Sequence, residues 1–131
     1  MIESSFITTL PDTWGIGEKF LMLPINKWDK EYQRVVLGGI TCDSHDYYDS
    51  EEHINEVFLP KIDEDTDPLY VGFFHTGAYQ DQISGYGGIK HCLIPSPKHI
   101  IVGYDKTGKL VDWVYAKEQT AQSMLKILGY K

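Results

Sequence analysis

The feature that most constrains the fold is a pair of β-rich runs flanking a short turn in the last third of the chain. The runs are His99–Tyr104 (HIIVGY) and Leu110–Tyr115 (LVDWVY), and Asp105–Lys109 (DKTGK) lies between them. Two runs rich in β-branched and aromatic residues, joined by a five-residue turn that contains glycine, predict a β-hairpin. The fold class then depends on what the rest of the chain adds to this strand pair.

Other short runs have the same character and are separated by Gly and Pro. Glycines inside a strand indicate a bulge or the close approach of another group, and Gly38 and Gly39 stand in the middle of one such run. Many short strands with Gly and Pro turns predict a mainly β chain that forms a barrel or a sandwich. The predicted strands are Phe6–Leu10, Phe20–Leu23, Arg34–Thr41 and, as a buried strand, Leu69–Phe74.

One helix is predicted at the C-terminal end. Ala121, Met124, Leu125 and Leu128 follow the i, i+3, i+4, i+7 spacing of a buried helical face, and Gly129 suits the C-terminal cap. A second short helix is predicted over Tyr79–Ile83.

Length and charge limit the classes of function. With 131 residues the chain is predicted to be one domain, and 12 Lys+Arg against 19 Asp+Glu give a net charge of −7. That balance argues against nucleic acid as a partner and would attract cationic ligands, although an ordinary solvated surface is the simpler explanation. No apolar run approaches the ~18 residues of a membrane span, and no signal peptide is recognised. Two cysteines do not make a disulfide framework. We therefore expect a cytoplasmic protein.

Two segments contain side chains suited to chemistry. Cys42 follows a predicted strand, where its thiol would be accessible for proton transfer, and Asp43 beside it could bind an ammonium group. The other interpretation is a buried structural cysteine beside a turn aspartate, and these residues alone leave both open. Tyr79 follows Gly77-Ala78, which would let a ligand approach closely, and Tyr86 stands in the glycine-rich segment Gly85–Gly88.

A metal site and a cysteine hydrolase are weaker alternatives. Cys42 and His45 are zinc-type ligands three residues apart, but no such pair recurs at metal-ligand spacing, so no metal is predicted. A nucleophile pair of Cys42 with His75 lacks an accompanying oxyanion motif. The acidic segment Asp63–Asp67 lacks the glycine and terminal glutamate of a calcium loop and is predicted to be a solvated turn.

Three motifs in order resemble one enzyme family. Pro11–Trp14 (PDTW), Thr41–Ser44 (TCDS) and Gly77–Gln80 (GAYQ) are similar to segments of the C-terminal domain of fold-type III pyridoxal-phosphate decarboxylases, and most of all to biosynthetic arginine decarboxylases. The resemblance runs from about Phe6 to Tyr104. It implies one C-terminal β-barrel domain over residues 1–131, of the type that ends alanine racemase, with short helices and a C-terminal helix.

The resemblance also implies roles for four residues. Cys42 matches the cysteine that protonates the substrate after CO₂ has left, and Asp43 matches the acidic residue that binds the distal cationic group. Tyr79 matches a tyrosine that contacts the phosphate of pyridoxal 5'-phosphate, and Tyr86 falls where relatives have a phenylalanine that lines the substrate pocket. The implied substrate is a basic amino acid, with arginine first, in the biosynthesis of polyamines such as spermidine.

The implied partners are an N-terminal barrel domain that carries the cofactor and a second copy in a homodimer. Because the resemblance places the cofactor lysine in that barrel, this chain alone is expected to be inactive. Some segments depart from the family pattern, notably a single arginine at Arg34, His75-Thr76 before the GAYQ motif, and Ile89–Pro97. The alternative from another class is a non-catalytic ligand-binding or interaction domain that retains the fold.

Overall fold

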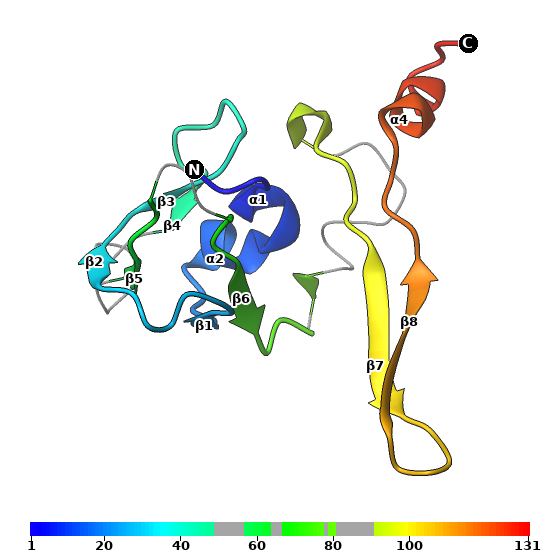
Figure 1. The fold of residues 1–131 in the computed structure, drawn as a ribbon. Helices are drawn as coiled ribbons and strands as arrows, with labels where there is room; N and C mark the ends of the chain where they lie inside the picture. Colours follow the sequence, from blue (N-terminus) through cyan, green and yellow to red (C-terminus); the bar gives the residue numbers. More distant parts are fainter. Residues whose placement is uncertain (49–56, 64–66, 78, 81–90) are drawn as a thin grey trace. The chain divides into compact units, whose positions relative to one another are not determined.

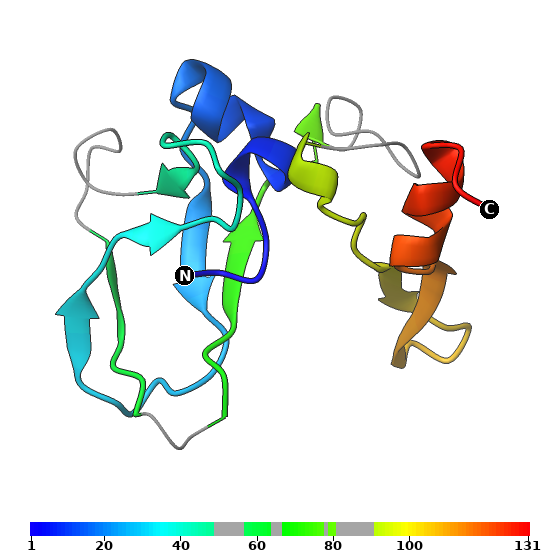
Figure 2. The same cartoon turned by 90° about the horizontal axis from the view of Figure 1, so that it is seen from above.

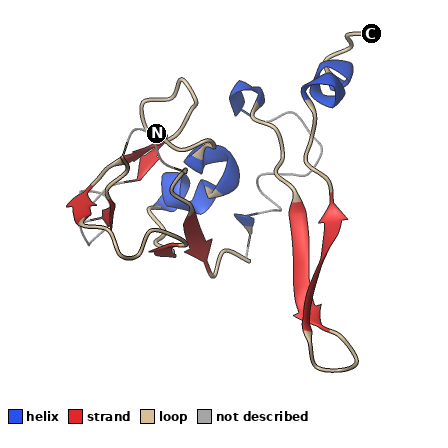
Figure 3. Ribbon diagram, in the orientation of Figure 1, coloured by secondary structure: helices blue, strands red, loops and turns tan. Residues whose placement is uncertain are grey.

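The computed structural model describes residues 1–48, 57–63, 67–77, 79–80 and 91–131. The chain divides into two compact units, Met1–Ser84 and Gly85–Lys131, and each is described by itself. Among the described residues of the whole chain, strands outnumber helices, so the prediction of a β-rich chain is confirmed (Figure 3). The elements of the first unit are α1 (Phe6–Thr9), α2 (Pro11–Ile16), β1 (Leu21–Pro24), β2 (Tyr32–Arg34), β3 (Leu37–Gly38), β4 (Tyr47–Tyr48), β5 (Phe58–Pro60) and β6 (Val71–Phe74).

The strands of the first unit pair two by two. β1 pairs with β6, β2 with β5 and β3 with β4, each antiparallel (Figures 1 and 2). β1 and β6 correspond to the predicted strands over Phe20–Leu23 and Leu69–Phe74, although β6 is half-buried rather than buried. Within the described ranges these pairs do not close into a barrel, and the barrel stays a prediction.

The prediction of a strand over Phe6–Leu10 is wrong, because this segment forms the helix α1. The Oγ of Ser5 accepts a hydrogen bond from the N–H of Thr8 at 3.3 Å, which is a helix N-cap. Pro11 is the first residue of α2, where a backbone N–H has no partner within the helix. The missing N–H of proline therefore costs nothing at this position. The β-branched residues that suggested a strand therefore lie in a capped helical turn.

The predicted strand over Arg34–Thr41 is also wrong as one element. It is divided between β2 and β3, which pair with different neighbours. The N–H of Val35 bonds to the carbonyl of Val57 at 2.9 Å, while the N–H of Ile40 bonds to the carbonyl of Ser4 at 3.0 Å. The backbone therefore changes its hydrogen-bonding partner between these two residues, and the continuous apolar run does not indicate where this happens.

Three aromatic rings form the centre of the first unit. The ring centroids of Phe6, Tyr48 and Phe73 lie 5.6–5.8 Å apart, mostly edge to face. Phe6 is 1% exposed, so the first residue of α1 packs into the core. Burial raises the pKa of the Tyr48 hydroxyl. The buried apolar residues of this core are Phe6, Leu10, Leu37, Tyr48, Val57 and Leu59.

The second unit contains the predicted hairpin. A kinked 3-10 turn, η1 (His91–Leu93), precedes β7 (His99–Tyr104), which pairs antiparallel with β8 (Leu110–Ala116). Asp105 shapes the turn, since its Oδ1 accepts from the N–H groups of Thr107 and Lys109 at 2.8 and 3.0 Å. The hairpin and its turn are confirmed at the predicted positions.

The C-terminal helix α4 (Ala121–Ile127) is confirmed, and Thr120 caps its N-terminus. Gly129 has a φ of +91° and ends the helix as predicted. The prediction of a buried stripe is wrong, because only Met124 is buried while Leu125 and Leu128 are 45% and 43% exposed. The predicted helical spacing is correct, but most of the apolar face of α4 is exposed.

Candidate functional site

The turn Gly39–Asp46 joins β3 to β4 and carries two of the predicted site residues. Its ends are held by the N–H of Gly39, which bonds to the carbonyl of Asp46 at 2.7 Å. Inside the turn, the N–H of Asp46 bonds to the carbonyl of Asp43 at 3.1 Å. Cys42 is exposed and forms no disulfide, so the interpretation of Cys42 as a buried structural cysteine is wrong.

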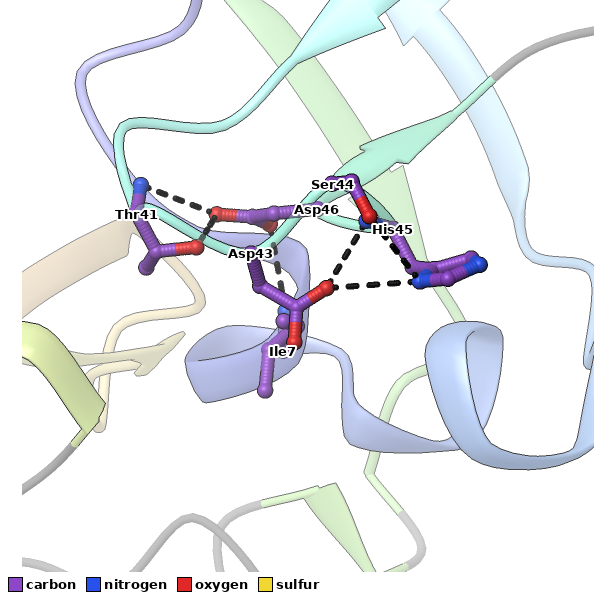
Figure 4. A network of polar contacts seen from close by, with 6 residues as sticks. All are labelled: Ile7, Thr41, Asp43, Ser44, His45 and Asp46. Atoms are coloured by element: carbon purple, nitrogen blue, oxygen red, sulfur yellow. Dashed lines mark hydrogen bonds and ion pairs between the residues drawn. The ribbon is translucent and has the colours of Figure 1, made fainter.

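Asp43 is fixed by its own turn. Its Oδ1 accepts a hydrogen bond from the N–H of His45 at 2.8 Å and lies 3.5 Å from Nδ1 of the same residue (Figure 4). The Ser44 hydroxyl lies 3.4 Å from that Nδ1. Such a contact to a backbone N–H two residues on is typical of an aspartate in a turn. Because the side chain is still 30% exposed, its carboxylate has room to accept a bond from a cationic group.

Asp46 is a site residue that the sequence interpretation missed. It is 4% exposed, and its carboxylate accepts hydrogen bonds both from Thr41 in its own turn and from the start of α1, far away along the chain. Oδ1 accepts from the N–H groups of Phe6 at 2.8 Å and Ile7 at 3.4 Å, and Oδ2 accepts from the N–H and Oγ of Thr41 at 3.1 and 2.6 Å (Figure 4). The turn is thereby tied to the N-terminus of α1.

These hydrogen bonds decide the charge state of Asp46. Burial by itself would raise the pKa of the carboxyl. The hydroxyl and N–H of Thr41, the Ser5 hydroxyl and the N–H of Phe6 favour the ionised form and together outweigh burial, so the pKa of Asp46 lies below its ordinary value. Asp46 is therefore a buried carboxylate, stabilised by neutral donors.

Gly39 makes the space that Asp46 occupies. A Cβ built at position 39 would overlap the Asp46 carboxylate, whereas a Cβ at Gly38 would meet nothing within 4 Å. The prediction that a glycine here marks a close approach is confirmed for Gly39. That glycine was the one signal in the sequence from which a buried partner could have been inferred.

The other predicted site residues lie on a different segment or outside the described ranges. Tyr79 follows β6, has a φ of +66° and is 67% exposed, so its hydroxyl is open to a ligand. Tyr86 lies outside the described residues, as do most of the predicted helix Tyr79–Ile83 and part of the acidic segment Asp63–Asp67. The structure thus brings Cys42 and Asp43 together in one turn, with Tyr79 on a separate segment.

The residue after Tyr79 connects two of the three motifs. Gln80 is 4% exposed, its Nε2 donates to Oδ2 of Asp12 at 2.8 Å, and its Oε1 accepts from the N–H of Asp12 at 3.3 Å. This reciprocal pair holds the start of α2 against the segment that carries Tyr79. No sequence signal joins two polar residues that are 68 positions apart.

Two further findings concern the part of the chain that the structure describes. No group of three or more His, Cys, Asp and Glu side chains gathers there as metal ligands would. None of its helices is both long enough and apolar enough to span a bilayer.

Known proteins named biosynthetic arginine decarboxylase are similar to almost the whole chain. The protein from Photorhabdus laumondii is 40% identical over 134 residues, and that from Marinobacter nauticus is 32% identical over 134 residues, each match covering 98% of this chain. The protein from Proteus mirabilis is 33% identical over 129 residues, or 95% of this chain. No protein-family model matches.

The chain spans about a fifth of the length of these relatives, since each match covers 20% of the longer protein. Of the resemblance stated from the PDTW, TCDS and GAYQ motifs, the similarity to biosynthetic arginine decarboxylases is confirmed. The chain is therefore related to a region of proteins named biosynthetic arginine decarboxylase.

Proposed function

We propose that this chain is the C-terminal domain of a pyridoxal-phosphate-dependent decarboxylase that acts on arginine in polyamine and spermidine biosynthesis. The observation that carries the proposal is a similarity over 98% of the chain to proteins named biosynthetic arginine decarboxylase. The net charge of −7 supports a cationic substrate, which an acidic protein attracts electrostatically. The complete enzyme is a cytoplasmic homodimer in this proposal.

The Cys42–Asp43 turn supplies two groups to the active site. The exposed Cys42 thiol donates a proton to the substrate carbon that has lost CO₂. The Asp43 carboxylate, oriented by the N–H of His45, binds the guanidinium group through charge-assisted hydrogen bonds. Because the two residues are adjacent in one turn, a single segment of this chain supplies both groups.

Tyr79 fits contact with the cofactor phosphate. Its side chain is 67% exposed on a segment fixed by the buried Gln80 next to it, so its hydroxyl is available to donate a hydrogen bond to a phosphate oxygen. Pyridoxal phosphate, when bound, supplies the electron sink for decarboxylation. Tyr86 is proposed to line the substrate pocket. The lysine that holds the cofactor is assigned to another domain, and the chain alone is expected to be inactive.

An exposed apolar face supports the proposal of a covering domain. On the sheet β1–β6, Met22 and Phe73 pack on the core of the first unit, while their neighbours Leu21, Leu23 and Phe74 are 40–52% exposed. The depression next to this face is lined by Leu23, Pro24, Trp28 and Tyr32. A contiguous apolar patch of this kind is typical of a surface that another protein segment covers. We assign the N-terminal barrel domain to it.

A chimera tests the function directly. The chain replaces the matching fifth of the Photorhabdus laumondii relative, and CO₂ release is measured with arginine, ornithine and lysine. Release from arginine in preference to the others supports the proposal. A folded, cofactor-loaded chimera without decarboxylation of any of them would favour the non-catalytic binding domain instead.

Single substitutions in the chimera then test the two roles. Cys42→Ala should lower kcat by about 10²-fold or more, the contribution of a positioned acid, while Cys92→Ala, at the other exposed cysteine, should leave kcat unchanged. Asp43→Ala should raise KM for arginine by roughly 10- to 100-fold, as expected for one charge-assisted contact, with Asp112→Ala as the matched control. An unaltered kcat in Cys42→Ala would remove the thiol from the mechanism.

A further inference from the structure

We propose that Asp46 is the positioning residue of the Cys42–Asp43 turn, holding the turn in the geometry that its two functional side chains require. The catalytic value of this role rests on the proposed function. The role itself rests on contacts of the Asp46 carboxylate that neither the sequence motifs nor the similarity to decarboxylases assigns. It would make the turn a preorganised part of the site rather than a mobile surface loop.

The side chain of Asp46 joins the two ends of the segment Thr41–Asp46. Oδ2 of Asp46 bonds to the N–H and hydroxyl of Thr41, the residue directly before Cys42. The N–H of Asp46 bonds to the carbonyl of Asp43 at 3.1 Å. Cys42 and Asp43 therefore lie in a small loop whose first and last residues are joined by one side chain.

The same carboxylate anchors that loop to the interior of the first unit. Oδ1 of Asp46 accepts from the N–H groups of Phe6 and Ile7, 40 and 39 residues away along the chain. Phe6 is 1% exposed and belongs to the aromatic centre of the core. A displacement of the turn would break these bonds and leave buried N–H groups unpaired, which is unfavourable.

Only a carboxylate satisfies all of these donors. The donors are three N–H groups and the hydroxyls of Thr41 and Ser5, and both carboxylate oxygens act as acceptors. An asparagine would turn an NH₂ group toward one pair of donors and could not accept from them. Asp46→Asn should therefore release either the Thr41 side or the α1 side while the side chain keeps its size.

The hairpin turn at Asp105 provides the internal comparison. Asp105 accepts a hydroxyl bond from Thr107 at 2.6 Å, the same length as the bond from Thr41 to Asp46. The described partners of the Asp105 side chain lie two to four residues away, so that carboxylate shapes its own turn. Asp46 differs by its burial and by its bonds to a distant helix.

Amide hydrogen exchange on the 131-residue chain tests the proposal. In Asp46→Asn, either the N–H groups of Phe6 and Ile7 or the N–H of Thr41 should exchange about tenfold faster, as expected when one buried hydrogen bond is lost. The informative amide is that of His45, which bonds to Asp43. Its exchange should rise by a similar factor if Asp46 holds the Asp43 turn.

Two variants and two patterns decide the result. Thr41→Val, a milder change in case Asp46→Asn does not fold, should also accelerate His45, while Thr107→Val should not. Acceleration confined to residues bonded to Asp46, with His45 unchanged, would overturn the positioning role. Acceleration of His45 no greater than that of the amides of β1 and β6 would show loss of global stability alone and would equally overturn it.

The kinetic test separates this inference from the proposed function. In the arginine-active chimera, Asp46→Asn should lower kcat and raise KM together, because both Cys42 and Asp43 lose their placement. If the chimera has no activity, the proposed function fails, and the His45 exchange rate still decides the role of Asp46.

Discussion

At the scale of single residues, Asp46 is an ionised carboxylate in a protein interior whose partners among the described residues are neutral donors. These donors are the backbone N–H groups of α1, the N–H and hydroxyl of Thr41, and the hydroxyl of Ser5. Such donors stabilise the charged form and lower the pKa of the carboxyl, against the effect of burial. The stability of the fold is thereby linked to the charge state of this one residue.

The linkage predicts how stability depends on pH. The pKa of Asp46 in the folded chain lies below its ordinary value of 3.8, so the unfolded chain binds the proton more readily. The contribution of the ionised Asp46 is therefore complete well above pH 3.8 and is lost as the pH falls through the lower folded value. Asp46→Asn should reduce the free energy of unfolding at pH 7, and that deficit should shrink toward pH 3.

Urea unfolding at a series of pH values between 7 and 3 measures this prediction. Asp105→Asn serves as the comparison, because Asp105 also has a lowered pKa but accepts its bonds in an exposed turn. Parallel curves for wild type and Asp46→Asn across the whole range would contradict a linkage through Asp46.

At the scale of elements, the close contact between Gly39 and Asp46 predicts a pair of unequal substitutions. Gly39→Ala should lower the free energy of unfolding by about 1–3 kcal/mol, since its Cβ would displace the buried carboxylate from its donors. Gly38→Ala should be neutral or slightly stabilising, because a Cβ there meets open space and the unfolded chain loses freedom. Thermal or urea unfolding of both variants measures the difference.

A cycle with Asp46→Ala sharpens that measurement. In the Asp46→Ala background the space beside position 39 is free, and Gly39→Ala should then cost little. An equal loss in both backgrounds would mean that the carboxylate is not what the added methyl group displaces.

The elements that sequence predicted correctly are those with local causes. The hairpin β7–β8 follows from two β-rich runs and a turn shaped by Asp105, and α4 follows from its spacing, its Thr120 cap and Gly129. Both depend on residues within a few positions of one another. The resemblance of the PDTW, TCDS and GAYQ motifs could equally be recognised from the sequence, because each motif is a short continuous segment and depends on no contact between distant residues.

The failures have distant causes. Phe6–Leu10 became a helix with its first N–H groups bonded to Asp46, and Arg34–Thr41 divided because its two halves pair with different segments. Cys42 and Asp43 could be proposed from their motif, whereas Asp46 and Gln80 could not, since their partners lie 40 and 68 residues away. A pattern of side chains along the chain contains no record of such pairings.

At the scale of the whole molecule, the exposed apolar face of β1–β6 predicts dependence on a covering partner. Leu21→Thr together with Leu23→Thr should lower the melting temperature of the chimera, because each buried leucine contributes about 1.5–3 kcal/mol when covered. The same two substitutions should reduce self-association of the 131-residue chain, as measured by its sedimentation in the ultracentrifuge. Gln33→Thr, on the exposed strand β2, is the control. An unchanged chimera would mean that the barrel domain covers some other surface.

The long-range bonds of the first unit also set the order in which it can form on the ribosome. α1 emerges first, yet the acceptor for its Phe6 N–H follows 40 residues later, and Gln80 follows Asp12 by 68 residues. At ~5–20 residues per second, α2 waits roughly 3–14 s for its partner. A nascent chain that stalls inside this interval presents unpaired helix ends and an open aromatic cluster to chaperones and proteases, so translation speed should influence its yield.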